Sequence, residues 1–130
     1  MEPTAEAAAP TGAPLPASVE TIDLEHLARM TLGERNLEAE VLTLFDRQAA
    51  VLLAHMRDSA PAAVAAFAHT LKGSASGIGA WRVAEAAAVV EMDAIRSGAG
   101  EVADAVVRLA AAVDEARAVI ADRLQLHAAR

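Results

Sequence analysis

The residues best suited to chemistry stand close together near the middle of the chain: His69, Lys72 and Gly73. An imidazole acts as a nucleophile when one ring nitrogen is held protonated and the other is left free. On a helix, Lys72 and Gly73 follow His69 by one turn. Glycine in the middle of a helix costs about 1 kcal/mol relative to alanine, which is the usual small residue of this chain. Gly73 therefore indicates that another molecule approaches the helix backbone beside His69.

A helix from Pro61 to about Ile78 is predicted to carry these residues. At about 100° per residue, its apolar side chains form one core-facing stripe, namely Val64, Phe67, Ala68, Leu71, Ala75 and Ile78. His69, Lys72 and Gly73 fall on the opposite side of this helix. Small residues surround His69 on the exposed face, and we expect them to bind a partner: Ala62, Ala65 and Ser76. Such a surface suits a weak, reversible contact.

The next helix, from about Ala80 to Arg96, carries a carboxylate, Glu91, inside its apolar arc. A carboxylate at the edge of a core needs a partner. If the two helices fold as a hairpin about Gly79, His69 lies roughly 15 Å and Glu91 roughly 18 Å from the turn, at 1.5 Å per residue. Glu91 would then accept a hydrogen bond from one ring nitrogen of His69 and leave the other free. The alternative is a solvated glutamate and an ordinary surface histidine, but the presence of Lys72 and Gly73 favours the functional interpretation.

The remaining periodic segments predict the helices that must position this site. We expect them at about 24–30, 34–57 and 101–127. Thr31 and Glu34 have the spacing of a capping box that opens the second of these helices. Because the connections are short, the predicted fold is all-α, an up-and-down antiparallel four-helix bundle with the short first helix across one end. Residues 20–130 would form this domain, whereas residues 1–19, with four of the five prolines, would be a disordered tail.

Composition excludes several classes of function. The net charge is −7 without a basic cluster, so nucleic acids and anionic membranes are not expected partners. There is no cysteine, and hence no disulfide or thiolate metal site. No apolar run is long enough to span a bilayer, and the N-terminus lacks the pattern of a secretory signal, so we expect a cytoplasmic protein. A glycine-rich nucleotide loop is also absent, which argues against a kinase.

Four further residues are candidates for a functional role, three histidines and the tryptophan. His26, His55 and His127 lack metal-ligand spacing, and we interpret them as boundary or surface residues. Trp81 begins the helix that carries Glu91. We expect it to fill the end of the bundle rather than to anchor a partner, because tryptophan is highly buried on average.

The stretch HTLKGSA from His69 to Ala75, followed by IGA at 78–80, resembles the motif of histidine phosphotransfer (HPt) domains. The resemblance covers about residues 20–127. It implies that His69 is phosphorylated on its outer ring nitrogen by the aspartyl phosphate of a receiver domain or by a histidine kinase. It also implies that Lys72 offsets the phosphoryl charge, that Gly73 leaves room for the partner's active site, and that Glu91 orients the imidazole.

The resemblance implies no cofactor of the chain's own, since the Mg²⁺ would belong to the partner receiver domain. Some family members carry a further basic residue one turn beyond Glu91, where this chain has Ile95. We expect a monomer, because each helix uses its one apolar face within the bundle. Two functions remain open: a phosphocarrier that is active through His69, and a helical adaptor that binds a receiver or kinase domain without carrying phosphate. Intact mass after incubation with a phosphorylated receiver separates them.

Overall fold

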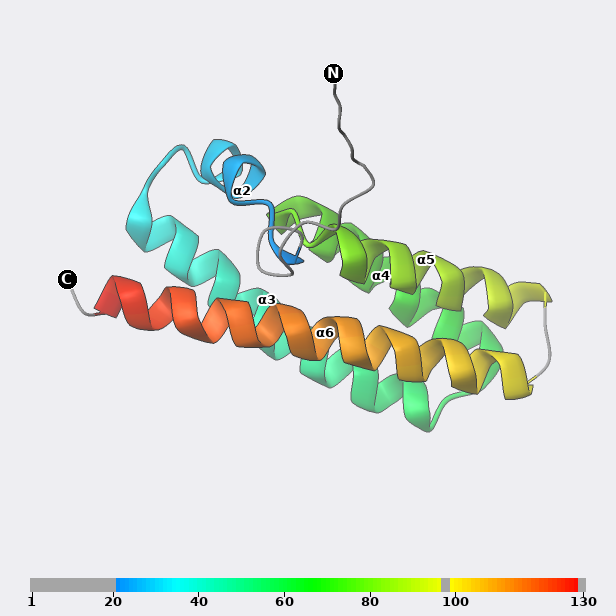
Figure 1. Cartoon of the computed structure of the whole chain (residues 1–130). Coiled ribbons are helices and arrows are strands. Elements are labelled where there is room, and N and C mark those ends of the chain that lie inside the picture. Colours follow the sequence, from blue (N-terminus) through cyan, green and yellow to red (C-terminus); the bar gives the residue numbers. More distant parts are fainter. Residues whose placement is uncertain (1–20, 97–98, 129–130) are drawn as a thin grey trace, which may run out of the picture.

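The computed structural model describes residues 21–96 and 99–128 of the chain. Within these ranges, five helices follow one another, and the prediction of an all-α fold is confirmed: α2 (Leu24–Met30), α3 (Arg35–Arg57), α4 (Pro61–Ile78), α5 (Trp81–Arg96) and α6 (Ala99–Ala128). Successive long helices run in opposite directions, and α2 lies across the end where α4 gives way to α5 (Figure 1). The predicted tail, residues 1–19, lies outside the described residues.

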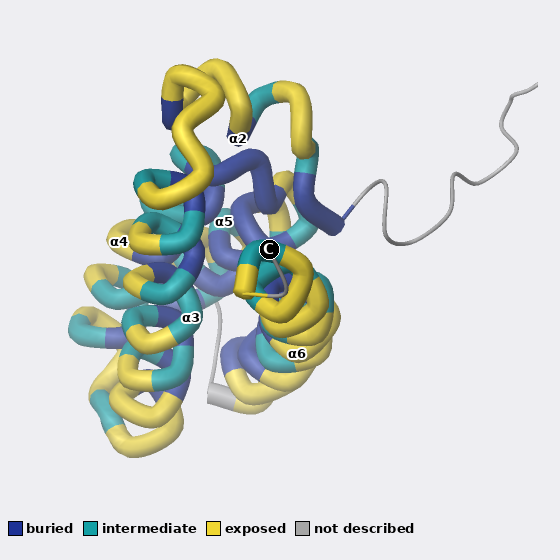
Figure 2. The backbone as a smooth tube through the Cα atoms, turned by 90° about the vertical axis from the view of Figure 1, so that its left-hand side faces the viewer, coloured by how far each residue is buried: buried dark blue, intermediate teal, exposed yellow. Residues whose placement is uncertain are grey.

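The core of the bundle is made of small and branched aliphatic side chains. Alanines from every long helix are almost fully buried, including Ala49, Ala68, Ala75, Ala87 and Ala116. Figure 2 shows the buried segments turned toward the interior between the four helices. Because the spacing between packed helices depends on the side chains at their contact, alanine allows the helices to approach closely. The backbone of α4 therefore lies close to its neighbours, and polar side chains at its edge can reach across to the next helix.

A tight turn at Gly79 sets the register of α4 against α5. Gly79 has a left-handed backbone with φ of 80°, and the N–H of Ala80 donates to the carbonyl of Ala75 at 2.8 Å, which closes α4 as predicted. A Cβ on Gly79 would lie 2.9 Å from the carbonyl oxygen of Asp23. The N–H of Asp23 in turn donates to the carbonyl of Gly79 at 2.9 Å. Glycine is thus required here by conformation and by space, and the turn also fixes the segment that leads into α2.

The predicted capping box before α3 is wrong. The hydroxyl of Thr31 donates to the carbonyl of Leu27 at 2.8 Å, so this residue closes α2 instead of opening α3. Leu32 and Gly33 then have left-handed backbones, with φ of 56° and 72°. These two residues turn the chain away from Thr31, and Glu34 precedes α3 without a side-chain cap. The spacing of a capping box is present in the sequence, but the backbone between its two ends is not helical.

Trp81 lies at the predicted end of the bundle, but it is not buried there. Its side chain is on the surface, with the residue 43% exposed. The indole N–H donates to Oδ2 of Asp23 at 3.0 Å, and the ring centroid lies 4.9 Å from that of His26. Trp81 therefore joins the start of α5 to α2 from outside. The expectation that it fills the bundle end by burial is not met.

Candidate functional site

His69 lies in the middle of α4 with its side chain 67% exposed. Its Nδ1 lies 3.0 Å from Oε2 of Glu91 on α5, so the predicted contact between the two residues is present. An ionised carboxylate only accepts hydrogen bonds, and therefore Nδ1 is the donor and carries the ring proton. In the neutral imidazole this leaves Nε2 with a free lone pair. The geometry holds one ring nitrogen and presents the other as a nucleophile on the surface of the bundle.

Glu91 contacts a second residue that sequence reasoning did not assign to it. Its Oε1 accepts a hydrogen bond from Nζ of Lys72 at 2.9 Å, while Oε2 faces His69. The Lys72 hydrogen bond is the main cause that lowers the pKa of Glu91, and the His69 hydrogen bond adds to it against the opposing effect of burial. Glu91 is therefore ionised at neutral pH. The resemblance assigned Lys72 to the phosphoryl group and Glu91 to the ring, whereas here Lys72 and His69 both contact the carboxylate of Glu91.

Gly73 lies one turn beyond His69 on the exposed surface of α4. A Cβ built at this position would meet nothing within 4 Å. The fold of the chain itself therefore does not require glycine here, in contrast to Gly79. The prediction that Gly73 leaves room for a partner stands as a prediction, and the open space agrees with it.

The predicted partner-binding residues lie on the same face of α4 as His69. Ala62 is exposed, while Ala65 and Ser76 are half-buried. The neighbouring part of α5 adds two large apolar side chains, since Met92 is 47% and Ile95 is 68% exposed. Periodicity placed Ile95 within the apolar arc of α5, but its side chain is exposed while Ala94 beside it is buried in the core, so Ile95 lies outside the edge of the buried stripe. The predicted partner-binding residues on α4 are thus small, and α5 exposes larger apolar side chains close to Glu91 in the sequence.

A second cluster of charged side chains lies away from His69, and sequence reasoning missed it. Glu38 on α3 is 7% exposed and accepts a hydrogen bond from Nε of Arg123 at 2.8 Å, and Nε2 of His127 contacts the same carboxylate. Burial raises the pKa of Glu38, but the hydrogen bonds from Arg123 and His127 outweigh it and leave the pKa lowered. The cluster joins the first turns of α3 to the last turns of α6. His127 is therefore a structural partner and not a simple surface residue.

The other two histidines lie against aromatic side chains. His55 lies edge-on to Phe67, with ring centroids 5.3 Å apart, and His26 lies against Trp81. Among residues 21–96 and 99–128, no three or more side chains of the metal-binding types are grouped so that they could hold a metal ion.

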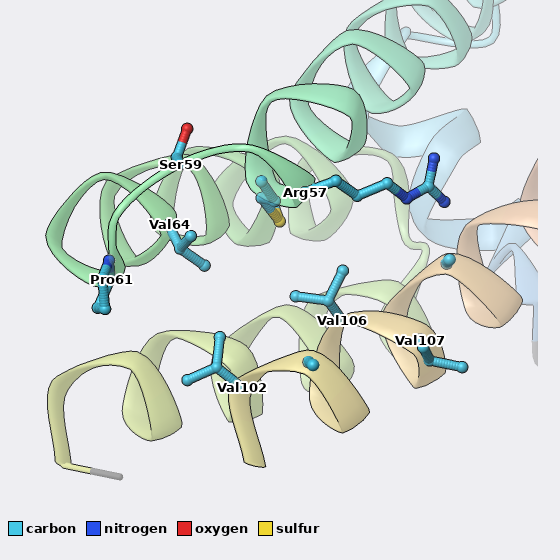
Figure 3. A pocket seen from close by; sticks show the side chains of 10 residues that line it. Arg57, Ser59, Pro61, Val64, Val102, Val106 and Val107 are labelled. Carbon is cyan, nitrogen blue, oxygen red and sulfur yellow. The ribbon is translucent and has the colours of Figure 1, made fainter. Parts of the chain in front are cut away.

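Two hollows of the described surface lie away from His69. One hollow of about 520 Å³ lies where α3 ends and α4 and α6 begin, with Arg57 and Ser59 as its polar rim (Figure 3). Another of about 640 Å³ lies between the start of α2 and the end of α6. His69 stands on an open helix surface, and a reactive group so placed suits a macromolecular partner better than a small molecule, which is normally enclosed by its pocket.

Comparison with known families identifies the class of protein. The chain matches the Hpt domain over residues 35–119, a range that includes His69, Lys72, Gly73 and Glu91. Neither curated proteins nor solved structures gave a match. The match covers more than half of the chain, and the chain therefore belongs to the Hpt domain family.

Hpt domains are phosphocarriers of two-component signalling that interact with receiver and kinase proteins. In the part of the chain that the structure describes, no helix is both long and apolar enough to cross a membrane.

Proposed function

We propose that this chain is a phosphocarrier that accepts a phosphoryl group on Nε2 of His69 and passes it on. The donor is the aspartyl phosphate of a receiver domain or a histidine kinase, and the acceptor is the aspartate of a receiver domain. The observation that carries the proposal is the hydrogen bond between Nδ1 of His69 and Glu91, 3.0 Å long, because it leaves Nε2 free and exposed. In an adaptor that carries no phosphate, the hydrogen bond between His69 and Glu91 would have no functional role.

In the proposed transfer, the lone pair of Nε2 attacks the phosphorus atom of the aspartyl phosphate. The N–P bond forms as the P–O bond breaks, and the aspartate leaves as a carboxylate. The proton on Nδ1 stays in place, so the ring acquires positive charge as the bond forms. The ionised Glu91 accepts the Nδ1 hydrogen bond and offsets that charge. No group of this chain has to move a proton during the step.

Phosphoryl transfer passes through a loose transition state, and catalysis depends mainly on positioning and on offsetting charge. The chain supplies the oriented nucleophile and the Lys72 ammonium. We propose that it has no cofactor of its own and that the receiver domain contributes the Mg²⁺ with the carboxylates that bind it. Accordingly we assign no enzymatic activity to the chain beyond its part in the transfer.

We propose that receiver domains dock on the surface formed by Ala62, Ala65 and Ser76 around His69, where Gly73 lets them approach the helix. The protein would act as a monomer, because the core-facing stripes of its long helices already pack against one another. We place it in the cytoplasm with its partners. Sedimentation at micromolar concentration tests the oligomeric state, and a tight dimer would contradict the proposal.

Intact mass spectrometry tests the function. Incubation with a phosphorylated receiver and Mg²⁺ is expected to add the mass of one phosphoryl group to the wild-type chain and none to His69→Gln. Circular dichroism serves as the control, since the exposed side chain at position 69 can be exchanged without loss of the helices. Undiminished labelling of His69→Gln, or no labelling of the wild type by any receiver or kinase, would overturn the proposal.

A further inference from the structure

Lys72 is already occupied in the unphosphorylated protein. It is the only lysine among the eleven lysines and arginines of the sequence, and its Nζ lies 2.9 Å from Oε1 of Glu91. Its side chain is 37% exposed and that of Glu91 is 21% exposed, so the pair lies at the protein surface but is partly shielded from water. An ammonium whose charge a carboxylate already offsets attracts a phosphoryl group less strongly than an unpaired ammonium does, because the two anions draw on the same charge.

The same carboxylate holds the ring that receives the phosphoryl group. Oε2 of Glu91 is 3.0 Å from Nδ1 of His69 while Oε1 holds Lys72. His69 and Lys72 are three residues apart on α4, a spacing that places their Cβ atoms about 5–6 Å from each other. A phosphoryl group on the imidazole would therefore lie within reach of the flexible lysine side chain. With a charge near −2 it attracts the ammonium more strongly than one carboxylate does.

We propose that Glu91 and the phosphoryl group compete for Lys72, and that this competition sets how readily His69 gives up its phosphoryl group. In the free protein the ammonium is bound to Glu91. Phosphorylation draws the ammonium to the phosphoryl oxygens, and the ion pair with Glu91 is lost. The inference rests on the proposed function and adds a role for Glu91, which acts on the transfer equilibrium through Lys72 in addition to orienting the ring.

The competition lowers the stability of the phosphorylated form. Each phosphorylation of His69 breaks the Lys72–Glu91 pair and leaves an ionised carboxylate near a phosphoryl group of the same sign. Both effects favour return of the phosphoryl group to a receiver aspartate. A carrier that passes its phosphoryl group on is helped by this, because it is not trapped in the phosphorylated state.

Lysine suits such an exchange better than arginine does. Its ammonium is a compact charge on a flexible stem, whereas a guanidinium binds a carboxylate through two parallel hydrogen bonds in a fixed geometry.

Glu91→Gln keeps an oxygen that accepts the Nδ1 hydrogen bond, but it removes both the ion pair with Lys72 and the negative charge that offsets the ring. The effect through Lys72 is isolated by making the same change with and without Lys72. The equilibrium constant for transfer between this chain and one receiver is measured from both directions in the presence of Mg²⁺. With Lys72 present, Glu91→Gln is expected to leave the equilibrium about two- to fivefold further toward phosphohistidine than the same change does in a Lys72→Ala background, the range of partly exposed ion pairs. In that background only the loss of the negative charge that offsets the ring remains. Glu85→Gln, which removes a charge from an exposed position of the same helix, serves as the control.

The exchange can also be observed directly at Lys72. Lysine labelled at its side-chain carbon and nitrogen gives one NMR signal from this sequence, because there is one lysine. The signal is expected to move on phosphorylation of the wild type. In unphosphorylated Glu91→Gln it is expected to lie at the position of an unpaired lysine.

The outcomes separate this inference from the proposed function. If the wild type is phosphorylated but Glu91→Gln changes the equilibrium by the same factor with Lys72 and with Lys72→Ala, then Glu91 acts on the ring alone and the inference is wrong while the function stands. A Lys72 signal that does not move on phosphorylation has the same meaning. If no receiver or kinase phosphorylates the wild type, the proposed function fails and the inference falls with it.

Discussion

Gly73→Ala is expected to make the protein more stable and a poorer carrier. The position lies within α4 outside the left-handed region of the backbone, and a Cβ there meets nothing within 4 Å. The substitution should therefore give the full difference in helix propensity, about 1 kcal/mol. For a domain of this size that corresponds to a rise in melting temperature of roughly 4 °C. No contact within the chain offsets the gain.

Transfer should change in the opposite direction. If a partner approaches the α4 backbone beside His69, the added methyl group lies in the contact, and a larger side chain obstructs it more. We expect the rate of phosphotransfer from one receiver to fall in Gly73→Ala and to fall further in Gly73→Leu. Thermal unfolding followed by circular dichroism and a time course of phosphotransfer are measured on the same preparations.

Gly77→Ala is a matched control for stability, because Gly77 also lies in α4 and a Cβ there likewise meets nothing within 4 Å. Its melting temperature should rise by a similar amount. The reasoning is refuted if Gly73→Ala destabilises the protein, because its own fold would then need the glycine. It is refuted equally if Gly73→Leu transfers at the wild-type rate.

Three further predictions concern the parts of the fold that hold the site. Gly79→Ala should lower the free energy of unfolding by about 1–3 kcal/mol in denaturant titrations, because of its left-handed backbone and the 2.9 Å approach to Asp23. Glu38→Gln should destabilise by about 2 kcal/mol at pH 7. The pKa of Glu38 in the folded protein is lowered, so the loss of stability in Glu38→Gln is complete above pH 4.5, the ordinary pKa of a glutamate. The loss becomes smaller as the pH falls through the lowered pKa. A loss of stability that does not depend on pH would contradict the assignment. Trp81→Phe should raise the pKa of Asp23, which the backbone N–H of His26 and then the indole N–H hold down, and carboxyl NMR signals report it.

Periodicity and turn chemistry predicted the parts of the molecule that depend on the backbone. The helix that carries His69 was expected from Pro61 to about Ile78 and has those bounds. One tight turn at Gly79 and a constant helical rise place Glu91 at the height of His69, so their contact was predictable. These features depend on local geometry that adjacent residues determine.

The features that sequence reasoning missed depend on side-chain ends and on contacts between distant segments. The Lys72 ammonium lies at the end of a long stem, and its choice of Glu91 follows from the neighbouring helix and not from residue spacing. The bonds from Arg123 to Glu38 join residues 85 positions apart, which no local pattern relates. Ile95 follows the apolar periodicity of α5 but is exposed, although its neighbour Ala94 is buried in the core. Thr31 and Glu34 have the spacing of a capping box in the sequence, but the turn between them is not helical, so here a local pattern gave a wrong prediction.

The central claim is that Nε2 of His69 carries the phosphoryl group while Nδ1 stays on Glu91. The most direct test is NMR of the chain with ¹⁵N-labelled histidine after phosphorylation by a receiver, because coupling between ¹⁵N and ³¹P identifies the bonded nitrogen. The account predicts one coupled nitrogen, Nε2 of His69, and none in His26, His55 or His127. Coupling at Nδ1 of His69, or at any other histidine, would contradict it.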